Sequence, residues 1–191
     1  RGESFKGSVL EHLLLQQLCA FYEVGEHNHI RLRGADWNDA LDMASERGES
    51  VAFTCAYAGN LMQLAQLLVV LQERYGWNQV ELLEEIQILL QDDAAVYDSI
   101  QAKQELLEQY VQRVSHQVSG KTILIDVKEL AENLRQKAVW MQEHIRSCEW
   151  IQGEAEGWFN SYYDNHGNKV EGYFEQGVRM MLTGQVFAVM S

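Results

Sequence analysis

The chain has 191 residues, 47% of them hydrophobic, and a formal net charge of −13 at pH 7. This length fits one domain or part of a larger one, and the apolar content is sufficient for a large core. Nucleic acids and anionic membrane surfaces attract basic faces, so the acidic balance argues against both as partners. A phosphate site stays open, because local charge can oppose net charge.

The chain contains three cysteines and no proline. Cys19, Cys55 and Cys148 are widely spaced within apolar helical patterns, which is typical of reduced, buried thiols in a cytoplasmic protein and not of a disulfide framework. We find no signal peptide and no unbroken apolar run long enough to span a bilayer. The absence of proline is unusual for a complete enzyme of this size, so we expect a piece of a longer protein.

Apolar residues recur at helical spacing along most of the chain. Gly76 is placed to end the longest of these segments, while Asp126 and Glu129 form a capping-box pattern at the start of another. The run 158–163 is strand-like and 164–168 is turn-forming, which predicts a small aromatic hairpin. The ranges that we expect to be helical are 8–22, 51–75, 78–90, 94–118, 126–150 and 178–190.

These segments give helix after helix, and no fixed-period repeat marks a solenoid. Residues 121–125 form only a short extended link between two of the helices. Paired helices of this length, with long loops at one end, suit an α/α toroid. We therefore predict an all-α fold, part of an (α/α)6 toroid with a small inserted β-hairpin.

Histidines raise the question of a metal site. His27 and His29 lie two residues apart in a polar turn, but a metal would need further ligands, and no second pair with zinc-like spacing is present. We therefore expect no metal. His12 interrupts the apolar face of the first helix, where a hydrogen-bonded core histidine is favoured over a ligand.

The segment 47–50 predicts the start of the longest helix. Gly48 supplies a free backbone, and Glu49 or Ser50 can cap the unpaired amides at the positive helix end. A substrate contact is the alternative role for Glu49, and the sequence leaves the choice open.

The polar loop Gly34-Ala35-Asp36-Trp37-Asn38-Asp39 combines two carboxylates, an indole and an amide. Such loops on a helical scaffold are where binding and catalysis are usually found. A carboxylic acid set against an indole has its charged form destabilised, which raises its pKa and suits it to protonate a leaving sugar oxygen. On composition alone, however, the favoured alternative is that Asp36 and Asp39 cap turns and Trp37 joins the core.

The loop, followed by Arg47-Gly48-Glu49-Ser50-Val51, resembles the catalytic-loop signature of glycoside hydrolase family 94. That family holds inverting β-glucan and disaccharide phosphorylases and the phosphorylase-like domain of cyclic β-1,2-glucan synthases. Residues 76–152 match it only in helical character. Ala35 and Ala40-Leu41 depart from the pattern of many members, and the sequence looks closest to the 1,2-β-oligoglucan phosphorylase branch. Further matches in the family's order are 11–12, 25–27, 158–172 and 185–191.

The resemblance implies a role for each loop residue. Asp39 matches the general acid and Trp37 an indole lining the donor-sugar subsite, while Asp36 and Asn38 match positions that shape that subsite or support the acid. Residues 1–191 would then be a partial (α/α)6-barrel catalytic domain with the general-acid loop at 33–49.

The implied activity is inverting phosphorolysis of a β-glucoside, such as a β-1,2-oligoglucan, to α-glucose 1-phosphate. Inorganic phosphate is the co-substrate and no cofactor is expected. The family's phosphate-binding residues would lie outside this chain, so we expect the fragment alone to be inactive. A homodimer is the oligomeric form to test for the full-length protein. Two alternatives remain: a chain-length-control domain of a cyclic β-1,2-glucan synthase, and a non-enzymatic helical scaffold.

Overall fold

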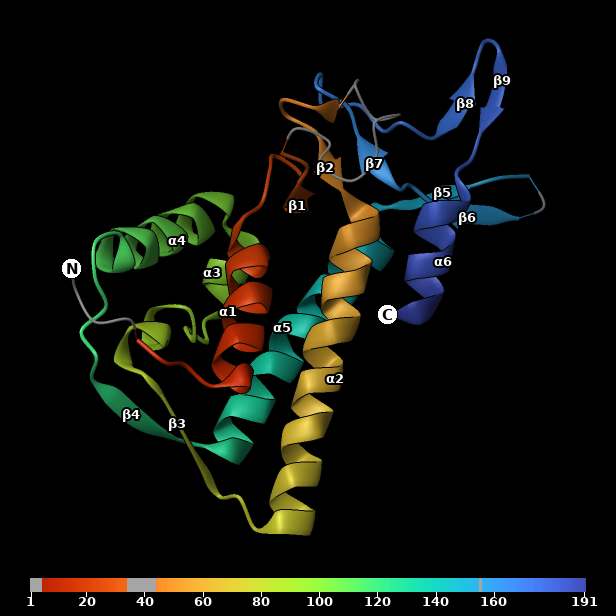
Figure 1. Cartoon of the computed structure of the whole chain (residues 1–191). Coiled ribbons are helices and arrows are strands. Elements are labelled where there is room, and N and C mark those ends of the chain that lie inside the picture. The colour runs from red at the N-terminus through yellow and green to blue at the C-terminus, as the bar shows by residue number, and fades with distance from the viewer. Residues whose placement is uncertain (1–4, 34–43, 155) are drawn as a thin grey trace.

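The structure is a computed structural model, and it describes residues 5–33, 44–154 and 156–191. Two long helices, α2 and α5, lie against each other along much of their length, with α1 beside them and α6 against α2 (Figure 1). A short 3₁₀ helix, η2, spans Glu84–Ile88. The α-helices are α1 (Val9–Tyr22), α2 (Val51–Tyr75), α3 (Ala94–Asp98), α4 (Ile100–Val114), α5 (Val127–Cys148) and α6 (Leu182–Met190).

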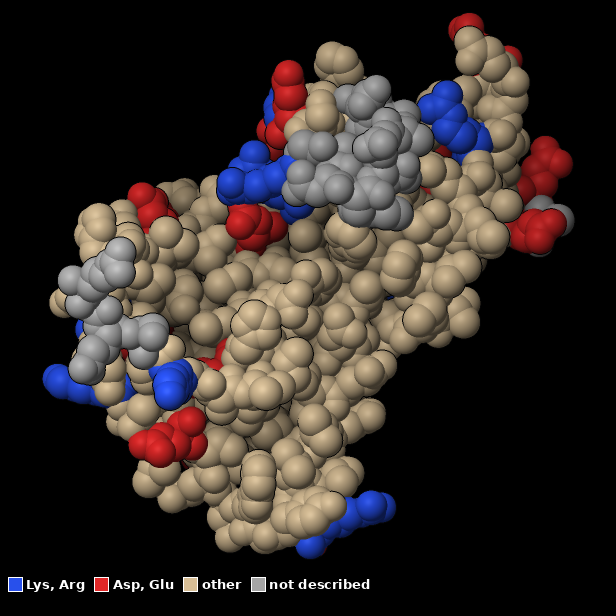
Figure 2. All heavy atoms as spheres, viewed as in Figure 1, with Lys and Arg blue, Asp and Glu red and all other residues tan. Residues whose placement is uncertain are grey.

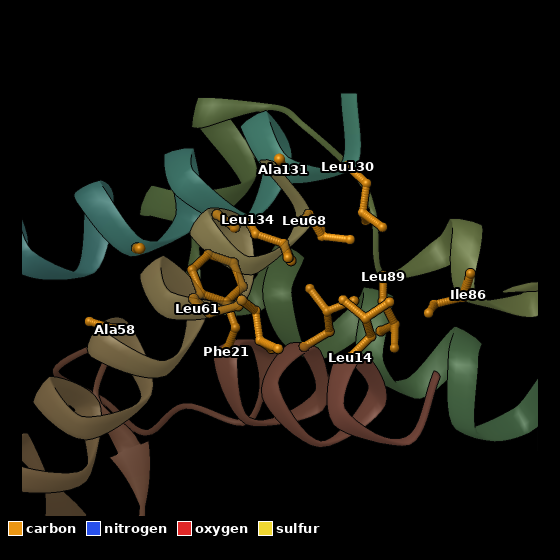
Figure 3. Packing of buried hydrophobic residues seen from close by; sticks show 14 of the residues in the cluster. Leu14, Phe21, Ala58, Leu61, Leu68, Ile86, Leu89, Leu130, Ala131 and Leu134 are labelled. Carbon is orange, nitrogen blue, oxygen red and sulfur yellow. The ribbon is translucent and has the colours of Figure 1, made fainter. Parts of the chain in front are cut away.

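The main core lies where α1, α2 and α5 meet, and η2 closes one side of it (Figure 3). Leu14 of α1, Leu61 of α2 and Leu134 of α5 are fully buried. Leucine at three- and four-residue steps gives each helix one apolar face, and burying these faces supplies the main stabilisation. The core therefore depends on the periodicity that the sequence displays.

Capping residues fix the ends of these helices. Ser50 Oγ accepts a hydrogen bond from Phe53 N at 2.9 Å at the start of α2, and Gly76 ends that helix in the left-handed region at φ 68°. Asp126 caps α5 by accepting from the amides of residues 128 and 129. The complete capping box is at α1, where Ser8 and Glu11 exchange two hydrogen bonds of 3.1 Å. Local sequence thus sets these helix ends, as predicted for α2, whereas the capping box predicted for α5 is shown only in its Asp126 half.

The helix α2 has no charged residue from Val51 to Gln72. Contrary to the expectation above, it is long and apolar enough to cross a membrane by length and composition. In the structure it packs against α1, α5 and α6 as a core helix.

The prediction of an all-α fold is wrong, because in the described part of the chain the helices are accompanied by four small antiparallel sheets. One sheet has the order β1-β2-β7, and three two-stranded sheets pair β3 with β4, β5 with β6, and β8 with β9. Strands of two to five residues are too short to show a clear two-residue period in sequence. The strands are β1 (Ile30–Arg31), β2 (Glu49–Ser50), β3 (Gln79–Leu83), β4 (Thr122–Asp126), β5 (Trp150–Gln152), β6 (Gly157–Phe159), β7 (Tyr162–Tyr163), β8 (Gly172–Phe174) and β9 (Gly177–Arg179).

Three of the predicted helices differ in the structure, two of them because part of the range forms a strand. The range 78–90 becomes β3 followed by η2, because Val80 and Leu82 alternate inward and pair with Ile125 and Ile123 of β4. The range 94–118 is divided at Ser99, which ends α3 and caps α4. The range 178–190 begins as β9 and becomes helical only at 182.

The aromatic hairpin is also distributed differently from the prediction. The turn at 164–168 forms, since Asp164 N donates to Asn168 O at 2.9 Å. Of the strands before it, however, β6 pairs with β5, which directly precedes it in the chain, and β7 pairs with the remote β2. A separate hairpin, β8–β9, projects from the molecule (Figure 1).

Two predictions on single residues are corrected. His12 is exposed, because the adjacent Glu11 takes the buried position on α1. Of the three cysteines, Cys55 is buried, Cys19 is half-buried and Cys148 is exposed at the end of α5. All three are free thiols, as predicted.

The face shown in Figure 2 carries few charged side chains over α2, and charges gather toward its edges. Exposed apolar residues of α2 and α6 contribute to the surface of these helices: Leu67, Val69, Val70, Leu182, Val186, Val189 and Met190.

Candidate functional site

The predicted site residues Asp36, Trp37, Asn38 and Asp39 lie outside the described residues, within 34–43. Their roles therefore stay predictions. The structure describes the chain on both sides of this segment and the strands and turn next to its two ends. We call the three-stranded sheet β1-β2-β7, together with the turn 25–29, the loop frame.

The loop frame joins three parts of the chain that are far apart in sequence (Figure 1). Arg31 pairs with Glu49, and Glu49 pairs in turn with Tyr163. Strand β1 leads into the segment 34–43 and β2 follows it, so the antiparallel pair brings both ends of the loop together. The loop thus leaves and returns at neighbouring positions of one small sheet.

Backbone hydrogen bonds close the base of the loop. Leu32 N donates to Gly48 O at 2.8 Å, and Gly48 N donates to Ala44 O at 3.0 Å. A Cβ on Gly48 would lie 2.2 Å from Ala44 O, so only glycine fits there without movement of the backbone. The amides of residues 46 and 47 donate to Asn165 Oδ1 at 2.8 and 2.9 Å. The turn at 164–168 therefore holds the returning end.

Glu49 is 1% exposed and binds the histidine-bearing turn. Its carboxylate accepts from His27 N at 3.0 Å and from His29 N at 3.1 Å, and it lies 2.7 Å from His27 Nδ1. Of the two roles left open for Glu49, the structure supports neither. Ser50 caps α2, and Glu49 connects the turn to β2.

His27 connects the same turn to β7. Its ring stacks on Tyr163 with centroids 3.7 Å apart and planes 9° apart. Gly25 permits the close approach of the turn to Glu49, because a Cβ there would lie 2.5 Å from the Glu49 carboxyl carbon. The turn is thus fixed from two sides, by the Glu49 carboxylate and by the Tyr163 ring.

A second buried carboxylate, Glu149, lies below the frame and is fully buried. It accepts from Tyr163 OH at 2.8 Å and from Asn160 Nδ2 at 3.1 Å, and it lies 3.0 Å from His29 Nε2 and 3.4 Å from Lys169 Nζ. Burial alone would raise the pKa of Glu149, but the interactions with His29, Tyr163 and Lys169 lower it to about 2. Glu149 is therefore an ionised structural anchor.

His144 of α5 supports the turn from the core side. Its Nε2 lies 2.8 Å from His27 O, and since a carbonyl can only accept, Nε2 carries the proton. The ring stacks on Trp140 and lies 4.9 Å from the His29 ring. Burial lowers the pKa of His144. Across the described ranges, 5–33, 44–154 and 156–191, no group of three residues suits a metal ion.

A third buried carboxylate, Glu171, accepts from Ser161 N at 2.9 Å and from Met181 N at 3.0 Å. Burial raises its pKa, and the hydrogen bonds oppose that rise. Glu49, Glu149 and Glu171 thus all bind protein groups around the frame. In chemical terms, these three carboxylates act as hydrogen-bond acceptors that join separate segments of the chain.

Sequence analysis missed most of these supporting residues. Glu149, Tyr163 and His144 gave no local signal, because each acts through partners far away in sequence; the Glu149–His29 contact spans 120 positions. The turn at 25–29 and the helix start at 47–50 were identified from local sequence, and parts of both also match a family motif. Local sequence alone offered no sign of the buried carboxylate contacts.

The chain matches no protein-family model. It is 24% identical over 187 residues to a solabiose phosphorylase of Paenibacillus borealis. That alignment covers 97% of this chain and 17% of the enzyme, so the chain spans less than a fifth of the length of the curated relative it matches. This distant similarity is consistent with a phosphorylase-like origin.

Proposed function

We propose that this chain is the part of an inverting β-glycoside phosphorylase that carries the general-acid loop. The observation that carries the proposal is the motif at 34–39, mounted on a frame whose buried carboxylates are all occupied by protein groups. The similarity to a solabiose phosphorylase supports the same class of reaction.

In the proposed reaction, Asp39 protonates the interglycosidic oxygen as its bond to the anomeric carbon breaks. Inorganic phosphate attacks that carbon from the opposite face, so a β-glucoside yields α-glucose 1-phosphate and no carboxylate base is required. Trp37 provides an apolar platform for the donor sugar, and Asp36 and Asn38 shape its subsite. Low solvent access beside an indole would keep Asp39 protonated near neutral pH.

The frame supplies the geometric requirement of this chemistry. A general acid must lie within hydrogen-bond reach of the leaving oxygen, and small displacements lower the rate strongly. The closed base at Leu32 and Gly48 and the anchoring of β2 through Glu49 restrict the two ends of the loop. Rigid ends restrict where the acid-bearing segment can lie.

The test is phosphorolysis by the intact protein with Asp39→Asn. Loss of a positioned general acid lowers kcat by about 10²- to 10⁴-fold. Asp126→Asn is a matched control, because it makes the same chemical change at a helix cap where asparagine also functions. Activity of Asp39→Asn near the wild-type rate would remove Asp39 from the acid role.

The substrate is addressed by the same assay. A panel of sophorose, laminaribiose, cellobiose, β-1,2-oligoglucans and solabiose, each with phosphate, would be followed by release of sugar 1-phosphate. We expect a β-1,2-linked glucan or a related disaccharide to react. If the intact protein releases no sugar phosphate from any of them, the phosphorylase assignment fails and the non-enzymatic scaffold is favoured.

A further inference from the structure

Two lysines are buried near each other below the loop frame. Lys103 of α4 is 1% exposed, and Lys137 of α5 is fully buried. Neither has a carboxylate within ion-pair distance among residues 5–33, 44–154 and 156–191. Buried lysines without such a partner are unfavourable for folding, so each needs an explanation.

The burial of Lys137 is explained by the hydrogen-bond acceptors around its side chain. Its ammonium donates to Gln91 O at 2.8 Å, to Asn133 Oδ1 at 2.8 Å and to Tyr97 OH at 3.1 Å. Three acceptors satisfy its three protons. All of them belong to the packing of α5 against the segment 91–97, and none is part of the loop frame.

Lys103 differs, because the one side-chain hydrogen bond that it makes within the described residues is to the frame. Its Nζ donates to Asn28 Oδ1 at 2.9 Å and otherwise faces the rings of Phe21 and Trp140, whose centroids are 4.2 and 3.9 Å away. Burial lowers the pKa of Lys103 to about 6, Asp98 opposes this shift and Lys137 adds to it. Lys103 is therefore buried where its charged form is disfavoured, and its amine binds one side chain of the turn, that of Asn28.

Asn28 is the residue of the turn 25–29 that adopts a left-handed backbone conformation. It has a φ of 63°, the one positive value of a non-glycine residue in the described part of the chain. Its Nδ2 donates to Tyr97 O at 3.0 Å, and its backbone N donates to Gly25 O at 3.2 Å. Its neighbours, His27 and His29, donate the two backbone hydrogen bonds that bind Glu49.

We propose that Lys103 is a positioning residue, which fixes the turn 25–29 through Asn28 and thereby sets Glu49 and the strand to which the acid-bearing loop returns. The proposal rests on the proposed function for its catalytic consequence, but not for its structural one. It explains why a lysine is kept at a site where burial disfavours its charged form.

The test compares Lys103→Met with Lys137→Met in the intact protein. Both substitutions remove a buried amine but leave its acceptors without that donor, so we expect only a small change in melting temperature from either. Hydrogen exchange of the peptide 23–31 should be about tenfold faster in Lys103→Met and unchanged in Lys137→Met, because local opening and not global unfolding is altered. Equal exchange in Lys103→Met and wild type, or equal acceleration in both variants, would overturn the proposal.

A second variant tests the route through Asn28. Asn28→Gly keeps access to the left-handed backbone but removes the acceptor of Lys103. If Lys103 acts through Asn28, the effects of the two substitutions on exchange are not additive in the double variant. Additive effects would show that Lys103 works by another route and would reject the proposal.

Catalysis provides the separate readout. In Lys103→Met we expect kcat to fall about tenfold with KM little changed, because misplacement of a reacting group lowers the rate more than binding. An unchanged kcat beside faster exchange would remove the catalytic consequence. If the wild-type protein has no phosphorolytic activity, the proposed function fails, and the exchange measurements still decide whether Lys103 positions the turn.

Discussion

The helical core and the loop frame are held together by different forces. The core joins α1, α2 and α5 through leucine side chains, which tolerate small shifts because their attraction is non-directional. The frame joins β1, β2, β7 and the turn through buried carboxylates, each with several directional partners. The comparison indicates that apolar packing supplies stability, whereas the polar contacts specify where the loop begins and ends.

The largest effect is expected from Glu149→Gln. It leaves the donors of Asn160 and Tyr163 and the partner His29 facing an amide, which lowers the free energy of unfolding by about 4 kcal/mol. The lowered folded-state pKa of Glu149 means that its contribution is complete above its unfolded-state pKa near 4.5 and is lost as pH falls toward about 2. Denaturant unfolding at pH 7 and pH 3 measures both effects.

The control for this change is Glu132→Gln, the same substitution at an exposed position of α5. Its unfolding free energy should stay near wild type, since exposed ion pairs contribute little. A loss in Glu149→Gln no larger than in this control would mean that the carboxylate network does not hold the frame.

Leu61→Ala tests the core side of the comparison. Leu61 is fully buried in the main cluster, and its truncation lowers the free energy of unfolding by about 3 kcal/mol. Native-state exchange of the peptide 23–31 should change much less than in Glu149→Gln, because the turn keeps its contacts. Leu67→Ala on the same helix, at a side chain that is 47% exposed, is the control and should have little effect. Equal loosening of the turn by Leu61→Ala would erase the distinction between the two regions.

The smallest of these effects is expected from Lys137→Met. Removing a buried amine relieves its desolvation but leaves Gln91 O and Asn133 Oδ1 without that donor, so the free energy of unfolding should change by less than about 2 kcal/mol at neutral pH. Burial lowers the folded-state pKa of Lys137 to about 7, and Asp92 opposes that shift. The unfolded chain then binds more protons than the folded one between pH 7 and about 10, so wild-type stability rises over that range.

Denaturant titrations at pH 7, 8 and 9 follow this slope. The variant should lose the part of the slope that comes from residue 137. If the free energies of unfolding of wild type and variant change in parallel over this range, Lys137 does not have the lowered pKa that its burial implies.

The helical core was the more predictable region. The apolar spacing of α1, α2 and α5 and the signals at Gly76 and Asp126 are local, so sequence locates these helices within a few residues. The strand β3 was missed, because the run 79–83 has a helix-compatible pattern until Ile123 and Ile125 pair with it. The division at Ser99 was missed because the continuous polar-apolar pattern gave no clear stop signal.

The candidate site was predictable only in part. The residues at 34–39 stand out by composition and by their resemblance to a family motif, and the structure does not describe them. Their supports depend on contacts between distant segments, such as Lys103 with Asn28, 75 positions apart. The two partners never fall within one short stretch of sequence. The sequence therefore identifies the loop but not the residues that hold its ends.

The way that Asn165 and Tyr163 reach the loop base limits how this segment can be used in protein engineering. A transplanted peptide from Gly25 to Ser50 would carry the motif and the turn. It would lack the Tyr163 ring that stacks on His27 and the Asn165 side chain that accepts from the amides of residues 46 and 47. Such a graft would need a host that already offers both groups at matching positions. The motif is therefore portable only together with a second, distant piece of its own chain.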